Sequence, residues 1–121
     1  MAMSAAKFHK KLRVHVVCSG LVYGNGEAND GFYEFFRRAW ISLHPELAAL
    51  PVVGDGANNL PTIHVKDLVR FVVALADETG KKIQKTYLIA VDNCQTSTQA
   101  QIMKSISGGL GSGALKTVSL D

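Results

Sequence analysis

The chain has 121 residues, of which 47% are apolar and 19% charged, and its formal net charge is +3. This length fits one small domain, and this apolar content is sufficient for a hydrophobic core, which excludes a fully disordered chain. No apolar run is long enough to span a bilayer and no signal-peptide core precedes Val14, so we expect a cytoplasmic protein without membrane contact.

The start of the chain carries most of the excess positive charge. The residues concerned are Lys7, Lys10, Lys11 and Arg13. No aromatic side chains alternate with them, so nucleic-acid binding is not expected. Residues 1–6 show no structural pattern and are interpreted as disordered or foreign to the natural chain. Cys18 and Cys94 lie far apart and outside any Cys-x-x-Cys motif, and we expect reduced, buried thiols.

The next part of the chain predicts two short strands, a loop and a helix. Residues 12–18 alternate and are rich in β-branched side chains, which predicts a strand, and residues 21–23 predict a second extended piece. Glycines and asparagines predict a loop over residues 24–31, in which Asp30 can cap the helix that follows. One face of this helix is apolar at i, i+3 and i+4 spacing: Phe32, Phe35, Phe36, Ala39, Trp40 and Leu43.

Residues 54–67 read Gly-Asp-Gly-Ala-Asn-Asn-Leu-Pro-Thr-Ile-His-Val-Lys-Asp and predict a turn, a short strand and the start of a helix. The glycines on either side of Asp55 permit positive backbone dihedral angles. Pro61 has no amide hydrogen to donate, which limits the extended piece to residues 62–65. Apolar residues then recur at helical spacing, and the helix is expected to end near Gly80.

The last part of the chain predicts a strand, a helix and a final strand. Residues 86–92 are continuously apolar, which is typical of a strand covered on both faces. Residues 96–98 offer caps for a helix that ends at Gly108-Gly109, and a strand is expected at residues 116–119. The glycines of residues 109–113 lack the strand and helix that a nucleotide-binding loop requires, so we interpret them as a flexible connection. Strands that alternate with helices predict an α/β fold.

Several motifs occur together in a characteristic order. They are Gly20-Leu-Val-Tyr-Gly24, Phe35-Phe36 followed by Ala39-Trp40, Gly54-Asp-Gly followed by His64-Val-Lys-Asp67, and Tyr87-Leu-Ile-Ala-Val-Asp92. This arrangement, over about residues 7–118, resembles the extended short-chain dehydrogenase/reductase family of nucleotide-sugar epimerases and dehydratases. Within that family it is most similar to the epimerase-like region at the amino terminus of certain adenylate kinases. The resemblance implies that residues 7–121 form a partial NAD(P)-binding domain, the carboxyl-terminal half of a Rossmann-like fold with parallel strands and helices.

The resemblance also implies where ligands would bind. It places Gly20, Leu21 and Val22 against the nicotinamide of NAD or NADP, although no cofactor is firmly assigned. Candidate substrate-binding residues are Tyr23, Arg37, Asp55 and His64. The histidines and cysteines share no ligand spacing, so no metal site is predicted.

The sequence departs from the family pattern at positions that matter for catalysis. It contains neither the family's Gly-x-x-Gly-x-x-Gly loop nor its Tyr-x-x-x-Lys pair, so no catalytic residue is assigned. Tyr33 and Arg37 imitate the pair most closely, but they lie on a helix after the first strands. Leu60 replaces the arginine that clamps a diphosphate in the family, which argues against nucleotide-sugar turnover unless Arg37 or Arg38 substitutes.

These observations leave two functions open. The chain is either a non-catalytic scaffold or regulatory module of a protein whose kinase domain lies elsewhere, or the substrate-binding half of an NAD(P)-dependent epimerase, dehydratase or reductase. For the first, the resemblance implies a location in cilia or flagella. A third class is a self-associating unit, because the strand at residues 12–18 and the face around Phe36 and Trp40 need a partner. That partner would be the remainder of the fold or a second copy of the chain, in a homodimer.

Overall fold

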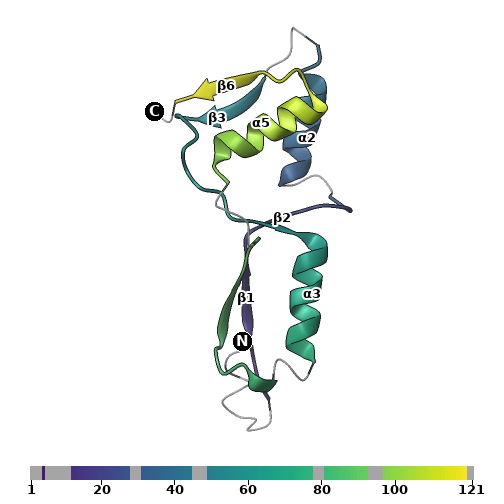
Figure 1. Ribbon diagram of the computed structural model, residues 1–121, viewed down its shortest axis with the longest axis vertical. Helices are drawn as coiled ribbons and strands as arrows, with labels where there is room; N and C mark the ends of the chain where they lie inside the picture. The colour runs from purple at the N-terminus through teal and green to yellow at the C-terminus, as the bar shows by residue number, and fades with distance from the viewer. Residues whose placement is uncertain are drawn as a thin grey trace.

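The structure is a computed structural model that describes residues 4, 12–27, 31–44, 49–77, 81–92 and 97–119. The named strands are β1 (Val16–Ser19), β2 (Leu21–Tyr23), β3 (Leu50–Val53), β4 (Thr62–His64), β5 (Tyr87–Ala90) and β6 (Leu115–Val118). The named helices are α2 (Phe32–Ile41), α3 (Val65–Ala76) and α5 (Gln99–Leu110). The strands pair in parallel as β1–β5, β2–β4 and β3–β6. The molecule is elongated, with α2, α5, β3 and β6 at one end and β1, β5 and α3 at the other (Figure 1).

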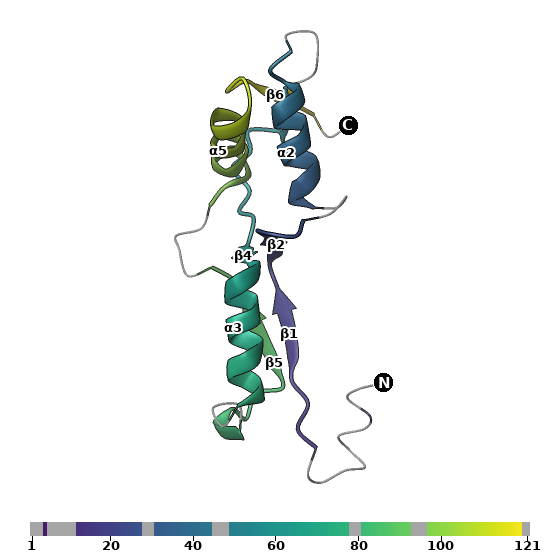
Figure 2. The same ribbon diagram turned by 90° about the vertical axis from the view of Figure 1, so that its right-hand side faces the viewer.

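The hydrophobic core lies at the end formed by α2, α5 and the β3–β6 pair. Leu50 of β3 and Met103 of α5 are completely buried there, together with Ala39 of α2. Figures 1 and 2 both show α2 and α5 side by side at this end. The predicted final strand is confirmed as β6, whereas β3, which contains Pro51, was not predicted. A proline is tolerated here because β3 has a single strand neighbour in the described part of the chain, so one edge makes no ladder bonds.

The β1–β5 pair differs from its prediction in three respects. β1 begins at Val16 rather than at residue 12, because its partner β5 begins only at Tyr87 and leaves the preceding residues without a strand to pair with. One face of β5 is open, with Tyr87 64% and Ile89 75% exposed, so the predicted cover on both faces is wrong for this chain. No described helix or strand lies over that face. Cys18 pairs with Ile89 in register and is also exposed, which corrects the expected burial of its thiol.

The observed helix ends can be compared with the capping residues that the sequence predicts. Thr98 caps α5 with a full capping box, as the Thr-Ser-Thr run predicts, but α5 continues through Gly108 and Gly109 to Leu110. The chain leaves the helix at Gly111, whose amide still donates to the Ser107 carbonyl at 2.9 Å. Two predicted caps are corrected: α2 has Gly31 rather than Asp30 as its N-cap, and α3 ends at Ala76 with Asp77 as its C-cap instead of reaching Gly80. The second cysteine and residues 1–6, except Ser4, lie outside the described residues.

Two amphipathic helices are only partly covered. In α2, Phe32 and Ala39 are buried, but Trp40 is 66% exposed, so the predicted apolar face is covered along part of its length only. α3 contains no buried residue, and Val69 and Val73 on it are exposed. In the described part of the chain, no helix is both long enough and apolar enough to cross a lipid bilayer.

Candidate functional site

A cavity of about 470 Å³ opens between α2 and α5, beside the strands β2 and β4. Its walls are largely apolar, and its polar side chains come from the ends of β2 and β5, from β4 and from α5 and the residues just before it. Tyr23 is the last residue of β2 and Asp92 follows β5, so the cavity lies near the carboxyl ends of two parallel strands, where such sheets bind ligands. The lining residues are Tyr23, Phe32, Phe36, Thr62, Asp92, Ser97, Gln101, Ile102, Ser105, Ile106 and Leu110.

Hydrogen bonds from β4 fix Asp92 in the cavity wall. Its Oδ2 accepts from the Thr62 hydroxyl at 3.0 Å, and its Oδ1 accepts from the backbone amide of His64 at 3.2 Å. The Asp92 amide donates in turn to the Thr62 carbonyl at 2.7 Å. An ionised carboxylate has about four lone-pair sites, so each oxygen retains capacity to accept another bond. Asp92 is therefore a fixed acceptor that lines the cavity.

Aromatic contacts position Tyr23 beside the same cavity. Its ring meets the ring of His64 edge-on, with centroids 5.2 Å apart, and lies 5.7 Å from the ring of Phe32. Gly24 allows this close packing, because a Cβ there would lie 2.8 Å from Nε2 of His64. The sequence-predicted residues Tyr23 and His64 are thus brought together.

The other predicted substrate-binding residues lie apart from the cavity. Arg37 donates from Nε and from its terminal nitrogen to Glu34, both at 2.9 Å, on the exposed surface of α2. Arg38 donates to the same carboxylate at 2.8 Å. These hydrogen bonds, first from Arg37 and then from Arg38, lower the pKa of Glu34 from 4.5 to about 2. Asp55 is exposed in the turn after β3, where its Oδ1 accepts from the Ala57 amide at 2.9 Å.

The predicted cofactor-binding residues occupy the start of β2 and the residue before it. Leu21 and Val22 are exposed on β2 and pair with Thr62 and Ile63 of β4. A Cβ on Gly20 would lie 2.6 Å from the Pro61 carbonyl oxygen. The approach of the Pro61 backbone is thus sufficient to require glycine at position 20, whether or not a cofactor binds there.

Sequence reasoning did not select Asp92, Thr62 or the α5 side chains as site residues. A usable signal was present for Asp92, since a polar residue directly after an apolar strand marks the carboxyl edge of a parallel sheet. The bond from Thr62 to Asp92 spans 30 positions, and no local pattern predicts it. Within the described ranges, no three His, Cys, Asp or Glu side chains gather as metal ligands.

Comparison with known proteins identifies the relatives of this chain. No family model matches it. It is 38% identical over 119 residues to adenylate kinase 7 of Macaca fascicularis and to adenylate kinase 7 of Mus musculus. The matched region is 98% of this chain but only 20% and 18% of those proteins. The chain therefore spans about a fifth of the length of these relatives.

Solved structures show the fold to which the chain belongs. A dTDP-glucose 4,6-dehydratase from Bacillus anthracis, solved in complex with NAD, superposes with a TM-score of 0.68 at 17% identity, over 99% of this chain and 36% of the enzyme. A UDP-N-acetylglucosamine 4-epimerase from Bacillus cereus superposes with a TM-score of 0.65 at 15% identity, over 97% of this chain and 39% of the enzyme. The predicted partial Rossmann-like fold is thereby confirmed. By sequence the chain is homologous to a segment of adenylate kinase 7, and by structure it has the fold of the nucleotide-sugar epimerases and dehydratases.

Proposed function

We propose that this chain is an epimerase-like module without catalytic activity of its own, which serves as a scaffold or regulatory domain in a protein of the adenylate kinase 7 type. Phosphorylation of nucleoside monophosphates in such a protein would belong to another domain, because the present sequence contains no Gly-x-x-x-x-Gly-Lys phosphate loop. A location in the cytoplasm of cilia or flagella belongs to the proposal through this resemblance. The observation that carries the proposal is that no cationic side chain is found among the described residues that line the cavity.

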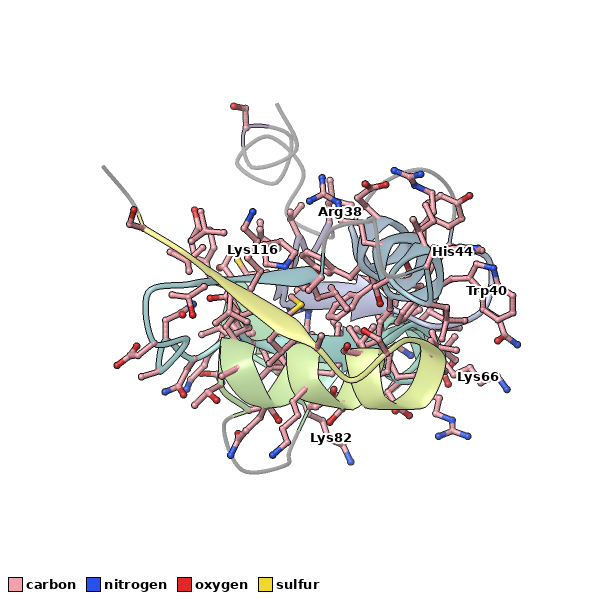
Figure 3. The ribbon with its side chains drawn as sticks, turned by 90° about the horizontal axis from the view of Figure 1, so that it is seen from above. Arg38, Trp40, His44, Lys66, Lys82 and Lys116 are labelled. Atoms are coloured by element: carbon pink, nitrogen blue, oxygen red, sulfur yellow. The ribbon has the colours of Figure 1, made fainter. Side chains whose placement is uncertain are left out.

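Substrates of the two structural neighbours, dTDP-glucose and UDP-N-acetylglucosamine, contain a diphosphate. Arginine recognises such a group through paired, charge-assisted hydrogen bonds. In this chain Leu60 stands where the resemblance predicts that arginine, and Arg37 and Arg38 are both bound to Glu34. Figure 3, a view along the long axis, shows the labelled Arg38 at the outer edge of the molecule. Among the described lining residues the one charged side chain is Asp92, which repels a diphosphate.

Proton transfer in the family needs a tyrosine whose pKa a neighbouring lysine lowers. Tyr23 lines the cavity, where it packs against the rings of His64 and Phe32. Tyr33 and Tyr87 are exposed and do not line the cavity. The sequence has no lysine four residues after any of its tyrosines, which supports a module that does not perform the redox chemistry of the family.

A second candidate is the substrate-binding half of an NAD(P)-dependent epimerase, dehydratase or reductase. It is favoured by the position of the cavity near the carboxyl ends of β2 and β5. In that case Gly20, Leu21 and Val22 would contact NAD or NADP, and the cavity would hold part of the sugar substrate.

Calorimetric titration distinguishes the two candidates. Neither NAD(H) nor NADP(H) should give saturable heat with this chain, and UDP-N-acetylglucosamine should give none either. The nucleotide sugar is the sharper probe, because the second candidate places its binding site within these residues. Micromolar binding of the nucleotide sugar or of either cofactor would refute the scaffold proposal. The epimerase from Bacillus cereus, titrated with the same solutions, is the positive control.

The scaffold proposal includes a polypeptide partner, which is the remainder of the fold or a second copy of the chain. Support comes from the exposed Tyr87 and Ile89 on β5 and the exposed Val69 and Val73 on α3, since apolar groups of this kind are usually buried in contacts. Sedimentation of the isolated chain at rising concentration should show reversible dimers if a second copy is the partner. A pure monomer would leave the remainder of the fold as the partner.

A further inference from the structure

We propose that the cavity between α2 and α5 binds a small, largely apolar molecule that carries no negative charge and donates a hydrogen bond to Asp92. This inference goes beyond the scaffold role, because a module without catalysis can still hold a regulatory ligand. It also departs from the substrates of the structural neighbours, which are anions.

Size and lining make the cavity suitable for a small molecule. Its volume of about 470 Å³ lies within the range of roughly 300–1,000 Å³ that is usual for ligand pockets. Phe36 from α2 faces a row on α5 in which Ile102 and Ile106 lie one helical turn apart and Leu110 follows. These side chains are only partly covered in the structure, so an apolar ligand would remove more of their surface from water.

Charge decides which ligands are accepted. No Lys, Arg or His lines the cavity in the part of the chain that the structure describes. In Figure 3 the labelled Lys66, Lys82 and Lys116 lie at the periphery of the molecule. A phosphate, sulfonate or carboxylate would therefore sit near the carboxylate of Asp92 without a compensating cation, in surroundings that screen charge less than water does.

Hydrogen bonding supplies the orientation of the ligand. Asp92 already accepts one bond at each oxygen, from Thr62 and from the His64 amide, so its position is fixed before a ligand arrives. Its remaining lone pairs can accept only from a donor such as an N–H or O–H group. Ser97 and Ser105 add hydroxyl groups to the lining. The predicted ligand is an apolar ring system with an amino or hydroxyl group.

Two fluorescent probes that differ in charge test this inference. N-phenyl-1-naphthylamine is neutral and has one N–H donor, and 8-anilino-1-naphthalenesulfonate has the same ring system with a sulfonate added. Fluorescence titration of the chain should show saturable binding of the neutral probe at one site per chain. The sulfonate probe should bind at least tenfold more weakly. Equal affinities, or no saturable binding of the neutral probe, would overturn the proposal.

Substitutions in and outside the cavity test whether the neutral probe binds there. Ile102→Trp fills the cavity and should weaken the neutral probe at least tenfold, whereas Ile89→Ser alters the exposed β5 face and should change its affinity less than twofold. If Ile89→Ser weakened the neutral probe and Ile102→Trp did not, the probe would bind to the exposed face of β5 and not in the cavity. Asp92→Asn removes the charge and should reduce the affinity ratio of the two probes to less than threefold. This ratio is measured on one protein sample, so a partial loss of folding affects both probes alike, and an unchanged ratio would overturn the role of Asp92.

The outcomes separate this inference from the proposed function. Binding of NAD(H) that leaves the neutral probe in place would refute the non-catalytic proposal and leave the cavity assignment intact. Displacement of the neutral probe by UDP-N-acetylglucosamine would overturn the assignment, because the displacing ligand is an anion.

Discussion

Replacement of Gly111 by alanine should destabilise the end of the molecule that contains the core. Gly111 ends α5 where this helix meets α2, and a Cβ there would overlap the Ala39 carbonyl oxygen and lie 2.8 Å from Oγ of Ser42. Its φ of −131° and ψ of −155° are open to any residue, so the effect would be steric rather than conformational. The atoms in the way cannot yield cheaply, since the Ser42 hydroxyl donates to the Ala39 carbonyl at 2.7 Å.

The magnitude follows from overpacking at a helix contact. Insertion of a methyl group into a well-packed contact costs about 1–3 kcal/mol. Because the obstacle is helix backbone, we expect the upper part of this range, about 2–3 kcal/mol. For a domain of this size, a loss of about 1 kcal/mol lowers Tm by roughly 4 °C, so the melting temperature should fall by about 10 °C.

A matched control exists three residues earlier on the same helix. Gly108 lies inside α5, and a Cβ there meets nothing within 4 Å. Gly108→Ala should therefore stabilise the chain by about 0.5–1 kcal/mol through helix propensity alone. Urea unfolding at constant m-value measures both variants. If Gly111→Ala and Gly108→Ala shift the midpoint in the same direction, the steric argument is refuted.

Three further predictions concern the core, a cap and an ion pair. Met103→Ala should lower the free energy of unfolding by about 2–5 kcal/mol in urea titrations, because the side chain is fully buried. Thr98→Ala should cost about 1 kcal/mol by loss of the α5 cap, while Thr98→Ser should retain most of it. The lowered pKa of Glu34 means that its bonds to Arg37 and Arg38 stabilise the fold above pH 4.5 and are lost as the pH falls toward 2. Glu34→Gln should thus be less stable than the parent at pH 7, and thermal melts should converge near pH 2.

Local chemistry explains the elements that the sequence predicted well. Pro61 limits the start of the three-residue strand β4, because it has no amide hydrogen to donate to a neighbouring strand. Thr98 sets the start of α5, because its side chain accepts a hydrogen bond from a backbone amide in the first turn. Cover on β5 depends instead on which polypeptide lies over the strand. The apolar run that contains Ile89 carries no information about whether that cover is present in the same chain.

The site residues show the same difference between local sequence signals and contacts that form only in the folded chain. Tyr23 and His64 were identified through motifs that the family shares, and they do lie together. Asp92 was missed, because its role depends on hydrogen bonds to β4 that only the folded chain creates. From the sequence, Arg37 was predicted to bind substrate, but in the structure it forms an ion pair with Glu34, one helical turn earlier.

Electrostatics explains why this fold need not imply the family's substrates. In the family an arginine clamps the diphosphate of the substrate, and here Leu60 provides no cation where the resemblance predicts that arginine. Glu34 holds both Arg37 and Arg38 on the outer surface of α2, so neither cation lines the cavity. Asp92 then gives the cavity the opposite sign of charge. Because the fold leaves these side chains free to vary, a similar backbone can serve ligands that differ in charge.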